Sequence, residues 1–316
     1  VDNIAAANSN NISGTTTLTA NGAASTVSFD NNASTFNDLA VNATGGISVN
    51  IGLSTDTGGI SVNADTDNTG SGDLTVAAVA AVSTGNNLLA ITANDVSLAG
   101  TLTSGAAAAT ITDSAGTGIG LGDTAIANGL NMSGAELQNI TATGLTLTTA
   151  GNITVDNIAA ANSNNISGTT TLDTGGGITF ANMASTFNAL TAQADDGIEV
   201  NANVHATSGN IDIAAGSAAI DAIQIGAGIT LTTGGGTISN EILAYSGGRF
   251  TALDQSMNVG APLAPPGVVV AEIDIEVSDT SGENFTVQVD WRLAERPPVP
   301  LPERVPPANL NAEVID

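Results

Sequence analysis

The chain has 316 residues, of which 4 are Lys or Arg and 30 are Asp or Glu, giving a formal net charge of −26 at pH 7. All four cationic residues are arginines that lie after position 248. We therefore expect neither nucleic acid nor an anionic membrane surface as a partner, because both are bound through clustered Lys and Arg. The chain has no Cys, which excludes a disulfide framework and a thiolate metal site, and no apolar run long enough to predict a membrane span.

The chain opens with a segment that occurs twice. Residues 1–18 read VDNIAAANSNNISGTTTL, and residues 155–172 repeat the same letters. Two copies of one unit predict one shared structure. In the second copy Val155 lies inside GNITVDNI, a predicted strand, so we expect Val1 to be a cut edge with further coils upstream.

The similarity continues beyond the identical block. Phe29 and Phe36 match Phe180 and Phe187, and these four aromatic side chains are predicted to fill the same interior position in each copy. A shorter echo, TGGISVN, occupies residues 44–50 and again 57–63. Nested repeats predict a solenoid, in which each short unit buries its apolar face against its neighbours.

Short runs throughout the body alternate apolar with small polar residues, which is the periodicity of strands. Between them lie clusters of Gly, Asn, Asp and Ser, which favour turns. An antiparallel meander would produce similar pairs of strands, but the nested repeat and the small side chains favour stacked parallel coils. At about 20 residues per coil the body would form roughly 12 coils, a rod about 60 Å long. The clearest runs are 25–29, 47–51, 73–76, 145–149, 151–155 and 229–233.

The last part of the chain differs from the body. We assign residues 1–248 to a solenoid built from a duplication (about 1–150 and 155–245) and residues 249–316 to a separate C-terminal segment. In that segment Val268–Val277 and Phe285–Leu293 alternate strictly, which predicts a β-hairpin followed by a proline-rich extension. The hairpin could cap the open strand edges of the last coil, or it could dock on the next molecule.

The segments GLTLTTAGNITVDNI, GTTTLDTGGGITFAN and TSGNIDIAAGS resemble the repeats of filamentous-haemagglutinin-like exoproteins and other large bacterial surface adhesins. The resemblance covers about residues 1–246. It implies a right-handed parallel β-helix, export across a Gram-negative outer membrane, and a role in adhesion or surface filaments. The amino-terminal secretion domain of that family has no counterpart in this sequence.

One loop has a composition suited to a metal ion. The sequence DTDNTGSGD places Asp65, Asp67 and Asp73 within one tight turn, and clustered carboxylate and carbonyl oxygens are what Ca²⁺ requires. The loop lacks the closing bidentate Glu, since Val76 stands at the twelfth position, and the second copy does not keep the pattern. These residues form either a calcium site or an acidic turn. No other cofactor is predicted.

The remaining candidates for chemistry favour structure over catalysis. His205 has no nearby partner residue, so we interpret it as a surface or loop histidine. The adjacent Asp195 and Asp196 could in principle cleave a glycosidic bond, but neighbouring residues on a strand point to opposite faces, and a solvated turn is favoured. No common catalytic motif occurs, so we expect no enzyme.

Four Thr-x-Thr triplets resemble the flat ice-binding faces of some solenoids. Their spacing along the chain is irregular, so we expect no flat face that recurs in each turn. The triplets begin at Thr101, Thr110, Thr146 and Thr230.

These observations predict a structural protein of the cell surface or the extracellular space. It would be an acidic β-solenoid rod that serves as an adhesin stalk or as the subunit of a filament held by end-to-end strand pairing. Its partners would be other copies of itself, head to tail, and surface glycans. The alternative is a β-helix that binds or cleaves carbohydrate.

Overall fold

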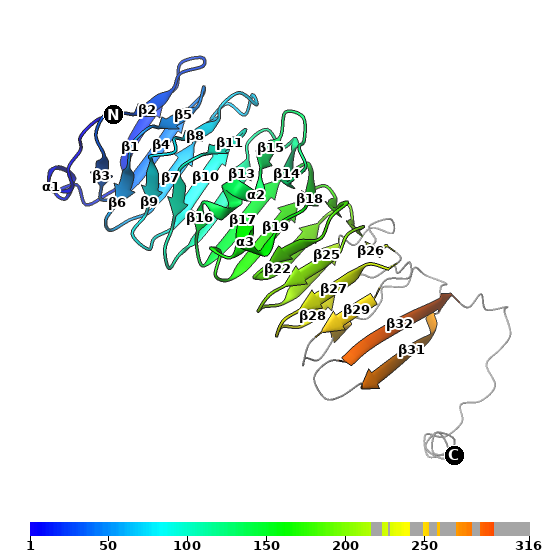
Figure 1. Cartoon of the computed structure of the whole chain (residues 1–316). Helices are drawn as coiled ribbons and strands as arrows, with labels where there is room; N and C mark the ends of the chain where they lie inside the picture. Colours follow the sequence, from blue (N-terminus) through cyan, green and yellow to red (C-terminus); the bar gives the residue numbers. More distant parts are fainter. Residues whose placement is uncertain are drawn as a thin grey trace, which may run out of the picture.

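Three columns of parallel strands define the fold (Figure 1). The computed structural model describes residues 1–215, 223–226 and 228–240, together with the backbone of strands 249–252, 258–259, 270–279 and 285–293. Most turns of the chain contribute one short strand to each column, and successive turns stack along one axis. The described body is a parallel β-solenoid of about 9 turns. The handedness of the coil stays a prediction.

The first column is one 11-stranded sheet that runs along the molecule. In spatial order it contains β1 (Thr16–Ala20), β4 (Leu39–Ala43), β7 (Ile60–Asn63), β10 (Leu89–Ala93), β13 (Ala108–Asp113), β17 (Gly144–Thr149), β19 (Thr169–Thr174), β22 (Ala189–Ala194), β25 (Ile211–Ala215), β28 (Ile238–Asn240) and β30 (Asn258–Val259).

The second column consists of two consecutive sheets. Outward from the N-terminal end, they contain β2 (Val27–Phe29), β5 (Ile47–Val49), β8 (Leu74–Val76) and β11 (Val96–Leu98), then β15 (Leu130–Met132), β14 (Gly118–Gly122), β18 (Asn152–Asp156), β20 (Ile178–Phe180), β23 (Ile198–Val200) and β26 (Ile223–Ile225).

The third column is also divided into two sheets. They contain β3 (Ser34–Phe36), β6 (Leu53–Thr55), β9 (Ala81–Ser83), β12 (Thr101–Thr103) and β16 (Ile140–Thr141), then β21 (Ser185–Phe187), β24 (Val204–Ala206), β27 (Thr230–Thr233) and β29 (Arg249–Ala252), followed by the antiparallel strands β32 (Phe285–Leu293) and β31 (Val270–Asp279). The two predicted roles of β31 and β32, capping the last coil or docking on the next molecule, both stay predictions.

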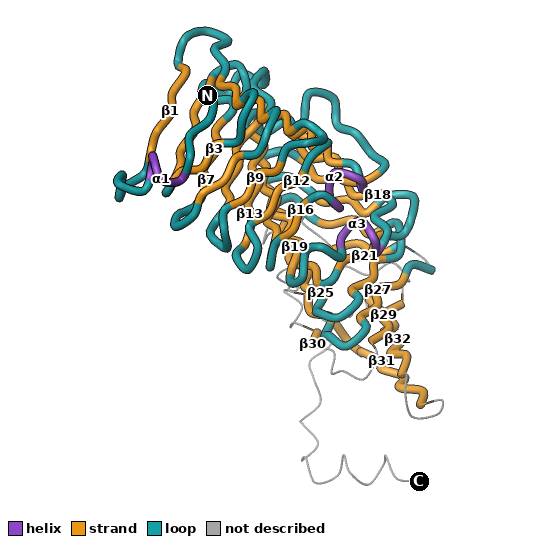
Figure 2. The backbone as a smooth tube through the Cα atoms, turned by 60° about the vertical axis from the view of Figure 1, so that its left-hand side comes forward, coloured by secondary structure: helices purple, strands orange, loops and turns teal. Residues whose placement is uncertain are grey.

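Three short helices lie beside strands of the third column, and Figure 2 draws them in purple. They are α1 (Ala6–Ser9), α2 (Gly134–Gln138) and α3 (Ala160–Ser163), and they contact β3, β16 and β21 respectively. Helices α1 and α3 are the same four residues, AANS, in the two copies of the identical block. Sequence periodicity did not predict them because one helical turn is too short to show a helical pattern. No described helix could cross a membrane.

The interior is a continuous apolar column, because alternate residues of every strand point inward. The four predicted aromatic positions are confirmed as interior: Phe29, Phe36, Phe180 and Phe187 are each at most 4% exposed. The outward positions of the same strands are mostly Ser, Thr and Asn, which tolerate the solvent. This alternation is the strand periodicity that the sequence predicts.

The predicted coil length of about 20 residues is correct for some turns and wrong for others. Because Leu89 pairs with Ala109 and Ala109 pairs with Leu145, one turn takes 20 residues and the next takes 36. The TGGISVN echo is not a coil repeat either, since Ile47 begins β5 in the second column and Ile60 begins β7 in the first. Longer turns explain why the body has about 9 turns instead of roughly 12.

The longest turn contains an additional layer. Strand β14 is buried at all five positions, and its outer side is covered by the loop that follows it. A Cβ atom on Gly120 would lie 2.9 Å from the Thr124 carbonyl oxygen and 3.0 Å from the Ala125 Cα. The alternating glycines of GIGLG therefore let a loop lie directly on the strand.

The long turn brings two of the Thr-x-Thr triplets together. Thr110 pairs with Thr146, and Thr112 pairs with Thr148, so two triplets stack in spite of their irregular spacing along the chain. The triplets that begin at Thr101 and Thr230 lie in the third column. Alanine, asparagine and aspartate occupy other outward positions of the first column, so the threonine array is short.

Candidate functional sites

The predicted calcium loop is organised around a buried carboxylate. Asp65 is 0% exposed. Its Oδ1 accepts a hydrogen bond from the Thr69 amide (3.3 Å), and its Oδ2 accepts from the Gly70 amide (3.0 Å) and the Ser114 hydroxyl (2.7 Å). Burial raises the pKa of Asp65, but the bonds from Ser114 and Gly70 lower it, with a net pKa below the usual range.

The other two predicted ligands are exposed, and each accepts a bond from a neighbouring side chain. Asp67 accepts from the Thr69 hydroxyl (3.0 Å), and Asp73 accepts from the Asn94 amide (2.9 Å). Among the described residues, no group of three His, Cys, Asp or Glu side chains is arranged to hold a metal ion. The geometry favours an acidic turn that internal donors stabilise, and calcium binding stays a prediction.

A second buried acid, two coils further on, lies at the corresponding turn, at the end of a strand of the first column. Asp113 is 4% exposed, and its carboxylate accepts from the Ala115 and Gly118 amides (3.1 and 2.9 Å) and from the Thr149 hydroxyl (2.8 Å). Three donors for one carboxylate offset the cost of its burial. This acid fixes the turn from the first column to the second.

Asp95 is an acid that the sequence analysis missed. Burial raises its pKa, and the negative charges of Asp73 and Glu136 raise it further, although the Asn131 amide donates to its Oδ1 (2.9 Å) and lowers it. Glu136 itself accepts from the Leu98 amide (3.1 Å) and forms the capping box of α2 with Ser133. Asp73, Asn131 and Glu136, which change the pKa of Asp95, are more than 20 residues away along the chain. No local sequence signal therefore identifies this acid.

The catalytic candidates belong to two different elements of the fold. Asp195 and Asp196 are both exposed, in the turn between β22 and β23. His205 is part of β24, on the outward side of the third column, and its Nδ1 lies 2.7 Å from the Thr232 hydroxyl on the next coil. The histidine is therefore on the outward side of a strand, beside another polar side chain. This is a surface position, one of the two alternatives predicted, and not a loop.

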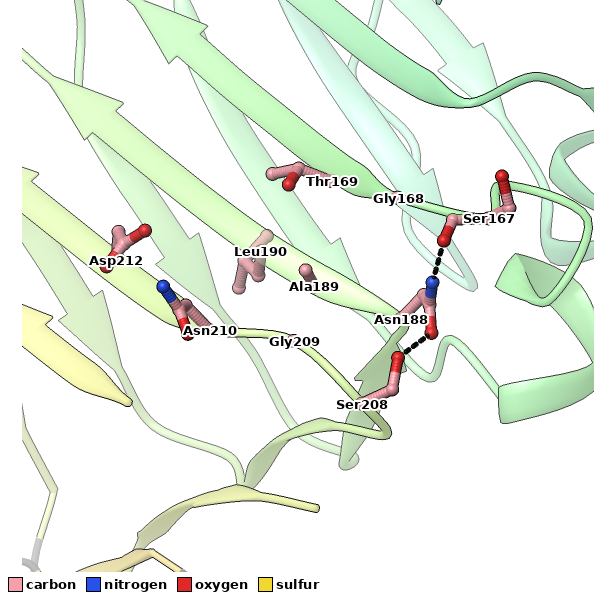
Figure 3. Close-up of a pocket in the computed structure, with 10 residues that line it drawn as sticks. All are labelled: Ser167, Gly168, Thr169, Asn188, Ala189, Leu190, Ser208, Gly209, Asn210 and Asp212. Carbon is pink, nitrogen blue, oxygen red and sulfur yellow. Dashed lines mark hydrogen bonds between the residues drawn. The ribbon is translucent and has the colours of Figure 1, made fainter. Parts of the chain in front are cut away.

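A polar groove of about 340 Å³ crosses three successive coils at the start of β19, β22 and β25 (Figure 3). The Asn188 side chain lies at one end of the groove, where Nδ2 donates to the Ser167 carbonyl oxygen and Oδ1 accepts from the Ser208 hydroxyl. Asn210 and Asp212 line the opposite end. Asn210 Oδ1 accepts from the Thr237 amide (2.9 Å).

The first copy has different residues at the matching place. Ala189 replaces Asp38, Asn210 replaces Gly59, and Asp212 replaces Ser61. The Asp38 carboxylate accepts from the Gly59 amide (3.1 Å) and lies against Gly58, so it occupies space that the Ala189 methyl group leaves open. The three replacements open the groove and add an amide and a carboxylate to it. Sequence reasoning missed the groove because its residues come from three coils.

No protein-family model matches this chain, and no significant match to a curated protein or to a solved structure is found. The β-solenoid fold therefore rests on the strand pairing described above.

Proposed function

We propose that this protein is structural, an acidic β-solenoid rod of a bacterial surface that serves as an adhesin stalk or as a filament subunit. The observation that carries the proposal is the single apolar column that continues through all the described coils. Such a column makes a stiff spacer, because each coil is held by its two neighbours over three strands. Export from a Gram-negative bacterium and a right-handed coil belong to the same proposal, and both are supported by the resemblance to adhesin repeats.

The outward charge supports a role as an extended, unaggregated rod. The described body has acidic side chains on many turns and no Lys or Arg before position 249. Like charges along the sides of two rods repel each other, so side-by-side aggregation is disfavoured. Contact through the ends of the rod then becomes the favoured mode of association.

Negative-stain electron microscopy and small-angle X-ray scattering of the full chain test this proposal. Turns that stack about 4.8 Å apart give about 45 Å for nine turns, so the particles should be elongated. The scattering curve should have the cross-section of a thin rod. Compact particles without an elongated axis would contradict the proposal.

A second candidate function, carbohydrate binding, is favoured by the polar groove. Amide, hydroxyl and carboxylate groups from Asn188, Ser208, Asn210 and Asp212 can bond to the hydroxyl groups of a sugar. The strongly negative charge of the chain disfavours acidic glycans, so the ligand would be a neutral saccharide.

The duplication offers a matched pair of variants for a neutral-glycan array. Ala189→Asp restores the first-copy residue and should fill the groove, so binding should be lost. Asp38→Ala changes the matching position of the first copy and should leave binding at the groove unchanged. Equal binding by the wild type and Ala189→Asp, or none by the wild type, would contradict this candidate. A reducing-sugar assay tests cleavage separately.

A further inference from the structure

The polar groove opens on the long sheet of the first column. Thr169, Ala189 and Asp212, which line the groove, are on β19, β22 and β25 of that sheet (Figure 3). Asp212, at one end of the groove, pairs with Thr191 on the preceding coil, and Thr191 pairs with Thr171. The groove therefore adjoins threonines of neighbouring coils.

These threonines belong to one row of outward side chains. Thr171 pairs with Thr146, and Thr146 pairs with Thr110, so one threonine follows another on four successive coils. Each is partly exposed and stands between two buried residues of its strand, which places its side chain on the outer face of the sheet. We call this set the threonine row; its members are Thr110, Thr146, Thr171 and Thr191.

The hydroxyl groups of the threonine row are free to bind a ligand. Within the described part of the chain, none of the four forms a hydrogen bond to another residue. Outward side chains of the third column can instead bond across coils, as the Thr35 hydroxyl does with the Ser54 hydroxyl (2.9 Å). Each free hydroxyl of the row can donate one hydrogen bond and accept others, so the row offers both kinds of partner to a ligand.

The side chains beside the threonine row are small. Two positions before each threonine, on the same side of its strand, stand Ala108, Gly144, Thr169 and Ala189. Three of these four have no side-chain atom beyond Cβ, so little projects above the backbone beside the row. Ala189 is also the residue whose short side chain leaves the groove open. A ligand seated in the groove can therefore continue beside the row.

Charge restricts what this surface can bind. The threonine row is uncharged, but Asp212 pairs with its last member, and Asp173 lies two positions after Thr171 on the same side of β19. The chain has no Lys or Arg before position 249. An anionic ligand, or the same acidic face of a second copy, would be repelled here. A neutral molecule rich in hydroxyl groups is not repelled, and it can bond to every threonine of the row.

The length of the surface selects a chain over a single sugar. From Asp212 to Thr110 the contacts pass over four coil spacings of about 4.8 Å each, or about 19 Å in all. Only a ligand of several linked sugar units can contact all of it at once. Because the coils stack along the axis of the rod, such a ligand must lie along that axis.

We propose that the groove and the threonine row together bind one linear, neutral polysaccharide chain, which lies along the axis of the rod. This inference rests on the carbohydrate binding proposed for the groove, to which it adds the form of the ligand and its direction. The groove holds one part of the chain, and the hydroxyl groups of the row bond to the sugar units that follow.

Isothermal titration calorimetry with the full chain tests the proposal. The probes are the disaccharides cellobiose, maltose and mannobiose and the longer oligosaccharides of the same three series. In a series that binds, the longer members should bind at least about tenfold more tightly than the disaccharide, because they reach the row as well as the groove. Ala189→Asp fills the groove and should abolish binding of both.

The threonine row can be tested with two matched double variants. Thr146→Val with Thr171→Val removes two neighbouring hydroxyl groups of the row and keeps the shape of both side chains. It should weaken binding of long oligosaccharides by about tenfold and leave disaccharide binding unchanged. The control is Thr154→Val with Thr179→Val, a pair of outward threonines on β18 and β20 of the second column, on the same two turns. The control should bind as the wild type does.

The outcomes separate this inference from the function on which it rests. If the wild type binds none of the probes, carbohydrate binding at the groove and the inference both fail. If disaccharides bind and Ala189→Asp abolishes that binding, but longer members bind no more tightly, only the inference fails. Equal effects of the two double variants on long oligosaccharides would also overturn it. So would association of the protein without glycan that Thr146→Val with Thr171→Val weakens in sedimentation velocity, since the row would then bind a second copy.

Discussion

The identical blocks 1–18 and 155–172 form the same local structure in two different surroundings. In the first block the Ile4 amide donates to the Ser34 hydroxyl, and in the second the Ile158 amide donates to the Ser185 hydroxyl, both at 3.2 Å. Helices α1 and α3 begin and end at matching residues. Among the described residues, the second block lies between two coils, whereas the first block has a coil on one side only. Local conformation follows from the sequence, whereas burial depends on the neighbouring coil.

The largest expected difference between the two copies concerns their interior aromatic residues. Phe180 lies between Val155 and Val200 on the adjacent coils, so Phe180→Ala should lower the free energy of unfolding by about 3–5 kcal/mol. Phe29→Ala should cost less, because among the described residues Phe29 pairs with a neighbour, Val49, on one side only. Urea unfolding followed by circular dichroism measures both. Equal losses would contradict this difference between the two positions.

Replacing Asp65, the buried acid of the DTDNTGSGD loop, should have the next largest effect on the free energy of unfolding. The second copy has no matching loop. Asp65→Asn removes a carboxylate that accepts three bonds and should cost about 1–3 kcal/mol at neutral pH. Asp67→Asn, at an exposed position, should change stability by less than about 0.5 kcal/mol.

The pH dependence of the Asp65 contribution follows from its lowered pKa. A carboxyl group whose pKa is lower in the folded than in the unfolded chain stabilises the fold above the unfolded pKa of about 3.9. This stabilisation is lost as the pH falls through the folded pKa. The stability difference between wild type and Asp65→Asn should therefore shrink below about pH 4. A constant difference down to lower pH would contradict the assignment.

A smaller and stabilising effect on the free energy of unfolding is expected from replacing a threonine that occurs in both copies. Thr170 is 1% exposed in the apolar column, and its hydroxyl has no hydrogen-bond partner among the described residues. Thr170→Val keeps the shape and removes the unpaired group, so it should stabilise the protein by about 1 kcal/mol. Thr16→Val at the more exposed matching position should stabilise less. Thermal unfolding of both variants checks the order, and destabilisation by Thr170→Val would contradict it.

The smallest expected effect is that of removing calcium. Because internal donors already satisfy Asp65, a chelator should shift the melting temperature by less than about 1 °C. The comparison is with the same sample after calcium is added back. A reversible shift of several degrees would instead support the calcium site predicted at Asp65, Asp67 and Asp73.

Much of the fold could be predicted from short-range patterns. The runs 145–149 and 151–155 correspond to β17 (Gly144–Thr149) and β18 (Asn152–Asp156), because alternation of apolar and polar residues requires one face to be buried. The number of turns could not be predicted in the same way. Loops between strands can lengthen without disturbing the stacked columns, so the spacing of motifs along the chain does not measure one coil.

The groove was beyond sequence reasoning for a related reason. Asn188 and Ser208 are 20 residues apart, and nothing local indicates that they are neighbours on adjacent coils. Among the acids, the sequence singled out Asp65 as a metal ligand from its loop composition. The structure instead gives it a partner, Ser114, that is 49 residues away.

The sequence by itself determined that this chain consists of strands with one apolar face, that the chain contains a duplication, and that its charge is strongly negative. These properties are local or additive, so they can be derived from residue types and their order. Only the tertiary structure decided which turns lie on one another, which acids are buried, and that the second copy of the repeated block lies between two coils. Those outcomes depend on pairing between segments whose separation along the chain is set by loops of variable length.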